Sequence, residues 1–103
     1  MSTRSTIKIE GIESVKVYKH FDGYPEATLP WLEHFNREFY KKRGDDPEYK
    51  FAQLLRSSAR DADTFNLDPS DSTGWGVIPY QADYGAEFEY TLKGDGTVEV
   101  ENV

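Results

Sequence analysis

The chain has 103 residues, a formal net charge of −7, 37% hydrophobic and 15% aromatic residues, and no cysteine. This length suits one domain over residues 1–103 with one core, and the aromatic content argues against disorder. The lack of cysteine excludes disulfides, thiolate metal ligands and cysteine nucleophiles. Together with the lack of an apolar signal or membrane-spanning run, it predicts a cytoplasmic protein.

The charge is unevenly distributed along the chain. Residues 1–60 contain nine acidic and eleven basic residues, whereas residues 61–103 contain ten acidic residues and one lysine, Lys93. Nucleic-acid backbones and anionic membranes are bound through basic side chains, so the acidic part disfavours both partners. We expect instead a partner protein with a basic surface. The alternative is that the acidic residues only keep the protein in solution.

Two short alternating runs open the chain. Hydrophobic residues alternate with polar ones over residues 7–9 and again over residues 15–18, with Gly11 in the turn between them, which predicts a β-hairpin. Successive side chains of a strand point to opposite faces. If the valines of the second run face the core, Tyr18 and His20 lie on the other face.

The next segment, residues 18–26, is the candidate site. Its Asp22-Gly23 pair predicts a tight turn between a strand and a helix, and such junctions often carry function. A histidine and two carboxylates within seven residues are the groups used in acid–base catalysis or to hold one metal ion. The candidate catalytic residues are His20, Asp22 and Glu26. The predicted binding residues of the junction are Arg4, His20, Asp22, Tyr24 and Glu26.

Three interpretations of this junction stay open. It is structural if Asp22 forms an Asx turn, Glu26 bonds the start of the helix and His20 donates to a loop carbonyl. It is a binding surface if Arg4, on the neighbouring strand, neutralises a carboxylate or receives an anion. It is a catalytic or metal site if its histidine and carboxylates act together, but no nucleophile motif or phosphate loop accompanies them. Whether the protein is an enzyme stays open, and we expect neither a metal nor a cofactor.

Helical periodicity begins after the junction. Thr28 is the predicted N-cap, Pro30 lies in the first turn, and a basic last turn is followed by Gly44 at the end of the helix. We expect Trp31 and Trp75 in the core and not as stacking platforms. The apolar stripe of the predicted helix consists of Trp31, Leu32, Phe35, Phe39 and Tyr40.

A second helix is predicted from the Asp45-Asp46-Pro47-Glu48 segment to about Arg60, with Phe51, Leu54 and Leu55 on its apolar face. Residues 61–74 have the composition of a loop. Their acidic spacing lacks the glycine and the final acid of a calcium-binding loop, so we expect an acidic surface loop. Residues 75–80 return to strand character, and Pro79 indicates an edge strand.

The clearest alternation in the chain covers residues 86–92, and a hairpin turn at residues 93–96 leads to a last strand. Pairing these strands places four glutamates on one face, where like charges repel. We expect solvent, a cationic partner, or Lys8 and Lys16 of the first hairpin to neutralise them. The predicted acidic binding face consists of Glu87, Glu89, Glu99 and Glu101.

These elements predict an α+β fold with an antiparallel sheet of about five strands. The expected order is strand, strand, helix, helix, strand, strand, strand. Because the two helices follow one another with a short turn, both should pack on one face of the sheet.

Two parts of the chain resemble a known family. The segment Thr3-Arg4-Ser5 precedes a hairpin and the string Tyr18-Lys19-His20-Phe21-Asp22-Gly23-Tyr24-Pro25-Glu26, and an acidic, aromatic strand with an Asp95-Gly96 turn ends the chain. This pattern is similar to small uncharacterised proteins encoded by bacteriophages, prophages and some bacteria. Phe21 stands where that family has Trp or Ser, and Thr97-Val98 replaces an aromatic residue. The resemblance implies a phage or mobile-element context in a bacterial host cell, and no mechanism.

We therefore expect a small acidic accessory protein of phage or prophage type, present as a monomer or homodimer. It would bind a host or defence protein, as an inhibitor or a nucleic-acid mimic. One alternative is a small-ligand-binding protein or hydrolase-like enzyme centred on His20, Asp22 and Glu26. The other is a structural, oligomeric phage component.

Overall fold

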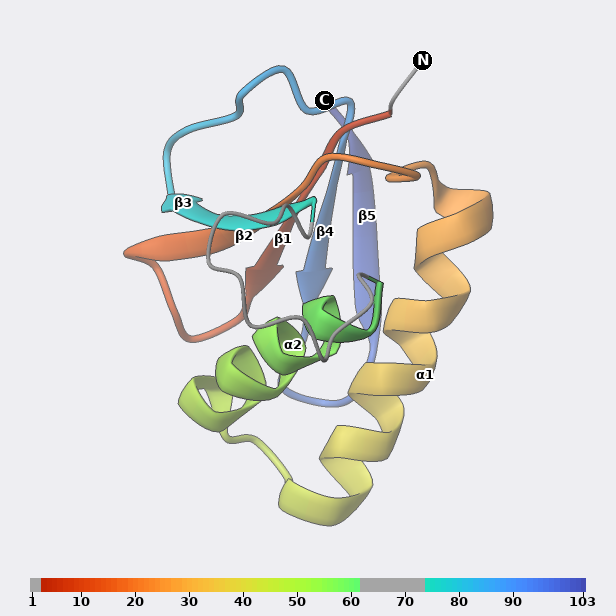
Figure 1. Ribbon diagram of the computed structural model, residues 1–103. Helices are drawn as coiled ribbons and strands as arrows, with labels where there is room; N and C mark the ends of the chain where they lie inside the picture. Colours follow the sequence, from red (N-terminus) through yellow and green to blue (C-terminus); the bar gives the residue numbers. More distant parts are fainter. Residues whose placement is uncertain (1–2, 62–73) are drawn as a thin grey trace.

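A five-stranded sheet with two helices on one face makes up the described part of the chain, residues 3–61 and 74–103, in this computed structural model (Figure 1). The predicted α+β fold and element order are confirmed. Most of the predicted acidic loop lies outside the described residues. The strands are β1 (Ser5–Ile9), β2 (Val15–Lys19), β3 (Trp75–Pro79), β4 (Phe88–Leu92) and β5 (Val98–Asn102), and the helices are α1 (Pro25–Arg43) and α2 (Pro47–Asp61).

The strand order in the sheet is β3-β2-β1-β4-β5, which makes β1 the central strand. Neighbouring strands are antiparallel except β1 and β4, which are parallel. The sheet is therefore mixed, whereas the sequence predicted an antiparallel one. The reason is topological. Strand β2 already occupies one side of β1, and residues 80–87 return the chain across the sheet, so β4 enters beside β1 in the same direction.

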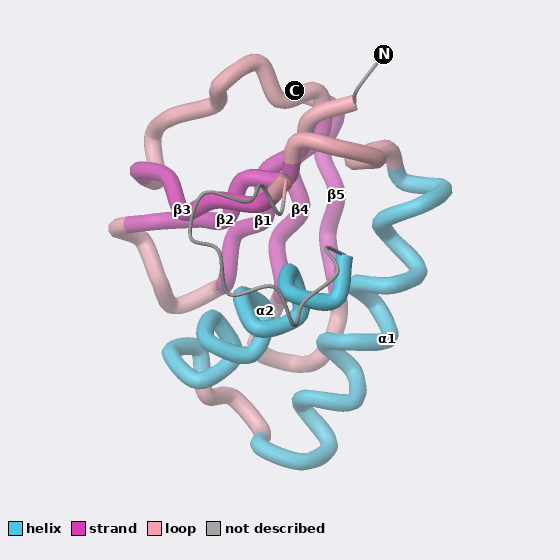
Figure 2. The backbone as a smooth tube through the Cα atoms, in the orientation of Figure 1, coloured by secondary structure: helices cyan, strands magenta, loops and turns pink. Residues whose placement is uncertain are grey.

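The returning segment crosses the sheet face opposite the helices (Figure 2). The ammonium groups of Lys8 and Lys16 lie 4.6 Å and 6.0 Å from the ring centroid of Tyr80. The rings of Tyr18 and Tyr84 meet edge to face at 6.1 Å. These contacts place Tyr18 on the face predicted for it and partly cover that face.

Helix α1 begins four residues earlier than predicted, since its N-cap is Tyr24 and not Thr28. Tyr24 is the N-cap, with extended backbone (φ −71°, ψ 151°), and Pro25 takes the first helical position, where its missing N–H costs little. Thr28 is buried inside the helix and does not cap it. Gly44 ends the helix as predicted, with φ 67° and its N–H donating to the Tyr40 carbonyl at 2.8 Å.

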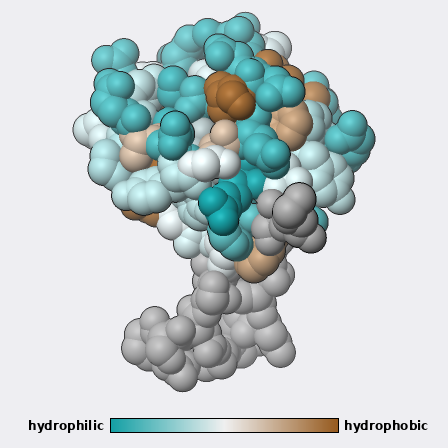
Figure 3. All heavy atoms as spheres, turned by 90° about the horizontal axis from the view of Figure 1, so that it is seen from above, coloured by the Kyte–Doolittle hydropathy of each residue, from teal (hydrophilic) through white to brown (hydrophobic). Residues whose placement is uncertain are grey.

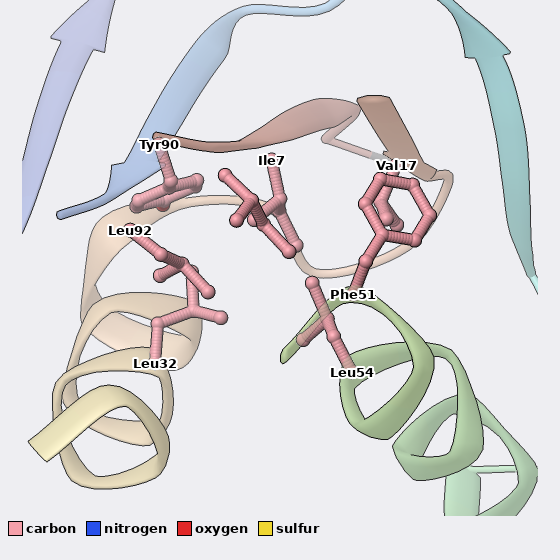
Figure 4. Close-up of a cluster of buried hydrophobic side chains, with 8 residues drawn as sticks. Ile7, Val17, Leu32, Phe51, Leu54, Tyr90 and Leu92 are labelled. Carbon is pink, nitrogen blue, oxygen red and sulfur yellow. The ribbon is translucent and has the colours of Figure 1, made fainter. Parts of the chain in front are cut away.

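The core lies between the sheet and both helices (Figure 4). Helix α1 packs over β4 and β5, and α2 packs over β1, so both helices cover the same face, as predicted. The buried hydrophobic side chains of this core are Ile7, Ile9, Val17, Leu32, Phe51, Leu54, Tyr90 and Leu92.

Two buried polar side chains join the helices to the β4–β5 turn. Asn36 of α1 donates from Nδ2 to the carbonyls of Lys93 (3.0 Å) and Thr97 (2.7 Å). Lys50 of α2, which is also fully buried, donates from Nζ to the Lys93 carbonyl at 3.2 Å. The turn is therefore held from both helices.

Candidate functional site

The junction between β2 and α1 is closed against the rest of the fold by three hydrogen bonds. The Gly23 N–H donates to the Thr3 carbonyl at 2.9 Å, and the Tyr90 hydroxyl donates to the Gly23 carbonyl at 2.6 Å. The Thr28 hydroxyl donates to the Asp22 carbonyl at 2.5 Å. These bonds tie the junction to the start of the chain, to β4 and to α1, so the fold sets its backbone path.

Two backbone positions of the junction require particular residues. Asp22 has a φ of 54°, in the left-handed region that Asp and Asn enter more readily than most other residues. Gly23 is buried, and a Cβ at that position would lie 2.6 Å from Ser5 Oγ and 2.9 Å from the Thr3 carbonyl oxygen. Backbone geometry therefore accounts for the Asp-Gly pair.

The structure separates the three candidate catalytic residues. His20 points to the sheet face away from the helices, where its Nδ1 lies 2.7 Å from the Tyr18 hydroxyl. Asp22 lines a cavity on the helix side, and Glu26 is exposed in the first turn of α1. Among residues 3–61 and 74–103, no group of three His, Asp or Glu side chains is arranged to hold a metal ion. In the described part of the chain, no hydrogen bond or ion pair joins any two of His20, Asp22 and Glu26.

The other two predicted junction residues have different surroundings. Arg4 donates from Nη1 to the Tyr84 carbonyl at 3.4 Å, and a Cβ on Gly85 would lie 2.9 Å from the same nitrogen. Tyr24 is the N-cap of α1, with its side chain partly exposed. Arg4 therefore contacts the segment that returns across the sheet.

Glu89 is the centre of a charge cluster on the sheet face away from the helices. Its carboxylate lies 3.0 Å from Lys8 Nζ and 2.8 Å from Lys16 Nζ, and it accepts a 3.0 Å hydrogen bond from the Thr6 hydroxyl. Burial alone would raise the pKa of Glu89, but the hydrogen bonds from Lys16, Lys8 and Thr6 together outweigh burial and hold this pKa below its usual value. The predicted neutralisation by Lys8 and Lys16 is confirmed for Glu89.

The other three glutamates of the predicted acidic face are exposed. Glu99 lies 3.1 Å from Lys93 Nζ, and Glu10 lies 2.7 Å from the same ammonium. Hydrogen bonds to these two carboxylates raise the pKa of Lys93. Glu87 and Glu101 appear in no ion pair within the described part of the chain. Half of the predicted acidic face is therefore engaged inside the protein.

A cavity of about 390 Å³ lies between the junction and the helix side of the sheet. This volume is within the range of roughly 300–1,000 Å³ that is usual for small-ligand sites. We call it the junction cavity. It is lined by Ile7, Lys19, Phe21, Asp22, Ala27, Thr28, Trp31, Leu32, Gly74 and Trp75.

A second hollow, of about 480 Å³, runs between α1 and α2. It arises because α1 lies over β4 and β5 while α2 lies over β1, which separates the helices on the sheet. We call it the helix groove. It is lined by Trp31, His34, Phe35, Glu38, Phe39, Lys42, Arg43, Tyr49, Gln53, Arg56 and Ser57.

Aromatic rings follow one another along the helix groove. Trp31 stacks on Phe35 with centroids 5.7 Å apart and an interplanar angle of 9°, and Phe35 stacks on Phe39 at 6.3 Å and 26°. Phe39 contacts Tyr49 of α2 at 6.0 Å, and the Arg43 guanidinium lies 4.1 Å from the Tyr49 ring centroid. Trp31 is 42% exposed and Tyr49 is 40% exposed, so solvent reaches both ends of this series.

The prediction that Trp31 lies in the core is wrong, and the helix groove was missed for the same reason. The buried residues of α1 are Thr28, Leu32, Asn36 and Phe39, so the buried face of the helix includes the polar Asn36 and leaves Trp31 exposed at the groove. Trp75 is partly buried against the core, which is closer to the prediction. The available signal was the width of the aromatic stripe, which exceeds the face that one helix buries on a sheet.

The end of the molecule that is uppermost in Figure 1 differs from the groove. The described surface seen there is mostly hydrophilic, with hydrophobic side chains scattered through it (Figure 3). Scattered hydrophobic side chains are normal on a protein surface, whereas grouped ones indicate contact sites. The helix groove is therefore the stronger candidate for an interaction surface.

Comparison with protein-family models, with curated protein sequences and with solved structures finds no match to this chain. The resemblance to phage and prophage proteins therefore stays a prediction. None of the helices within residues 3–61 and 74–103 has the length and apolar character that a bilayer crossing requires.

Proposed function

We propose that this protein acts by binding an acidic segment of another protein in the helix groove. The observation that carries the proposal is the series of rings from Trp31 to Tyr49, which lines the groove between two helices, is exposed at both ends and is bordered by basic side chains. The sequence-based expectation of a binding protein is kept, but the surface and the charge of the partner differ from that expectation.

The aromatic rings suit a contact surface. Large rings bury much area for little loss of side-chain freedom, and Trp and Tyr are enriched among residues that dominate binding energy. Trp31 and Phe35 are already stacked on one another, so binding orders them little further. An apolar or aromatic side chain of a partner would pack against these rings.

The charges at the rim of the groove favour an acidic partner. Lys42 is exposed and pairs with no carboxylate in the described part of the chain, and Arg56 donates to the neutral Gln53 side chain at 3.0 Å. The one carboxylate of the lining, Glu38, lies 3.2 Å from the Lys41 ammonium. Arg43 shares its charge with Asp46 at 3.5 Å. The rim therefore keeps basic groups available for carboxylates of a partner.

A selection of random displayed peptides against the immobilised protein tests this proposal. We expect enriched peptides that combine Asp or Glu with an aromatic or large aliphatic residue. A parallel selection against Arg56→Glu should lose these peptides, and one against Arg37→Glu should keep them, because Arg37 is an exposed residue of α1 outside the groove. Failure to enrich any peptide, or identical enrichment on Arg56→Glu, would show that the groove is not the binding surface.

A second candidate surface is the acidic sheet face. Through it the protein would bind and inhibit a host or defence protein that has a basic surface. Glu87 and Glu101 favour it, because both are exposed, and the β4–β5 register places Glu101 beside Glu89. A Glu87→Lys, Glu101→Lys double variant tests it without disturbing the Glu89 cluster. Loss of a captured basic partner in this variant alone would support the acidic face.

The enzyme alternative has no comparable support. No hydrogen bond joins His20 to Asp22, since His20 contacts the Tyr18 hydroxyl and Asp22 lines the junction cavity, and Glu26 is exposed on the first turn of α1. General acid–base catalysis needs groups within hydrogen-bond reach of one substrate. A small-ligand role for part of the junction is a separate matter, since Asp22 lines a cavity.

A further inference from the structure

The junction cavity contains both tryptophans of the chain and one side chain of each charge. We propose that it is a binding site for a small aromatic zwitterion, the chemical class to which the aromatic amino acids belong. This proposal does not depend on the helix groove, although Trp31 lines both hollows.

The walls of the cavity are aromatic and its floor is apolar. Trp31 and Trp75 meet edge to face with centroids 6.1 Å apart, and Phe21 of the junction is 50% exposed beside them. Ile7 and Leu32, both fully buried, form the floor. Aromatic rings prefer such edge-to-face and offset contacts, so a planar ring of a ligand is the complementary shape.

Two residues of opposite charge, Lys19 and Asp22, line this cavity without forming an ion pair with each other. Lys19 Nζ donates to the Phe21 carbonyl and lies 5.8 Å from the ring centroid of Trp75. Asp22 is only three residues away, but its left-handed backbone (φ 54°) changes the direction of the chain between them. Within the described part of the chain, neither side chain forms an ion pair.

A zwitterion satisfies both of these groups at once. Its carboxylate would accept from the Lys19 ammonium, its ammonium would donate to the Asp22 carboxylate, and its ring would lie against the tryptophans. A ligand with only one charge leaves one protein charge unmatched and meets it as a like charge or as an unpaired group. The cavity therefore selects against simple aromatic acids and aromatic amines.

The test is a titration of the full chain with L-phenylalanine, phenylacetate and phenethylamine, three probes that share a ring and differ in charge. The signals of the two tryptophan indole N–H groups in ¹H–¹⁵N spectra report directly on the cavity. We expect L-phenylalanine to shift both signals. Each singly charged probe should bind at least about tenfold more weakly than L-phenylalanine. No shift with L-phenylalanine, or equal affinity for phenylacetate or phenethylamine, would overturn the proposal.

Two variants locate the charges. Lys19→Met and Asp22→Asn should each weaken L-phenylalanine binding about tenfold or more, whereas Arg56→Glu in the helix groove should leave it unchanged. Asp22→Asn keeps a residue that tolerates the left-handed backbone, so the fold should persist, and the indole signals of the free variant check this. If Asp22→Asn does not fold, Lys19→Met decides the question. Unchanged affinity in a folded variant contradicts the proposal.

Discussion

The Tyr90 hydroxyl donates a 2.6 Å hydrogen bond to the Gly23 carbonyl, which ties the middle of β4 to the junction between β2 and α1. Tyr90 is fully buried, and burial raises its pKa to about 12. The bond explains why the most distinctive segment of the sequence has a fixed path: the junction is fastened to the core. Its exposed groups are then free to take part in binding.

Replacing Tyr90 by Phe should destabilise the protein by about 1–3 kcal/mol, because the buried Gly23 carbonyl loses its partner. Urea unfolding followed by circular dichroism measures this. Tyr84→Phe is the matched control, since Tyr84 is 58% exposed, and its free energy of unfolding should stay within about 0.5 kcal/mol of wild type. Equal stability of Tyr90→Phe and Tyr84→Phe would contradict the role given to this bond.

Gly23→Ala should destabilise the protein by about 1–3 kcal/mol, because the new methyl group would lie 2.6 Å from Ser5 Oγ and 2.7 Å from Ser5 Cβ. Gly76→Ala in β3 is the control, since nothing lies within 4 Å of a Cβ built there. The midpoints of urea unfolding compare the two. A Gly23→Ala protein as stable as Gly76→Ala would show that the junction has room to move.

The Glu89 cluster should make stability depend on acid. The native pKa of Glu89 lies below its value of about 4.3 in an unfolded chain, so between these two values the unfolded chain binds more protons. The free energy of unfolding should therefore fall as the pH drops below about 4.3 towards the native pKa.

Glu89→Gln should remove this part of the acid dependence. At neutral pH it should also cost on the order of 3 kcal/mol, because the buried Lys16 loses its charged partner. Urea titrations at a series of pH values measure both effects. Glu87→Gln is the control, since its exposed side chain makes none of these contacts. The idea fails if Glu89→Gln and Glu87→Gln have the same acid dependence.

Lys50→Met should leave the free energy of unfolding within about 1 kcal/mol of wild type or raise it. Burial lowers the pKa of Lys50, against the attraction of Asp45, Glu10 and Asp95, so the charge is held at a cost. The Lys93 carbonyl keeps its bond from Asn36 when the lysine is removed.

The same lysine should affect stability at alkaline pH. Because the native pKa is lowered, the unfolded chain binds more protons between that value and about 10.4, so the contribution of Lys50 to the free energy of unfolding rises with pH there. Lys50→Met should lack this rise, and Lys41→Met, on the exposed surface of α1, should retain it. A loss of more than about 2 kcal/mol at neutral pH in Lys50→Met would mean that the lysine stabilises the fold.

The local elements could be predicted because short-range signals decide them. Alternation identified four of the strands and residue type identified β3, and the Asp46-Pro47 and Arg43-Gly44 segments identified the ends of the two helices that meet there. The parallel pairing of β1 with β4 could not be predicted, because the residues of the two strands do not determine their relative direction. The early start of α1 was missed because Thr28, a good cap by type, is used to hold the Asp22 carbonyl.

The candidate site was harder to predict because it depends on which residues the fold brings together. His20 and Asp22 are two residues apart, yet His20 contacts the Tyr18 hydroxyl whereas Asp22, with its left-handed backbone, lines the junction cavity. The helix groove combines residues of two helices, and Trp31 lines it because the buried face of α1 includes Asn36 and not Trp31. Lys19 lines the junction cavity because the pairing of β2 with β3 places it beside Trp75, which is distant in the sequence.

Calorimetric titration of a selected acidic peptide tests the central claim most directly. The helix groove predicts that Lys42→Glu and Arg56→Glu each weaken the affinity about tenfold or more, whereas Arg37→Glu, an equal change of charge outside the groove, leaves it nearly unchanged. The same affinity for wild type, Lys42→Glu and Arg56→Glu would contradict the claim that the groove binds an acidic partner. An equal loss of affinity in Lys42→Glu, Arg56→Glu and Arg37→Glu would show that only the net charge of the protein matters.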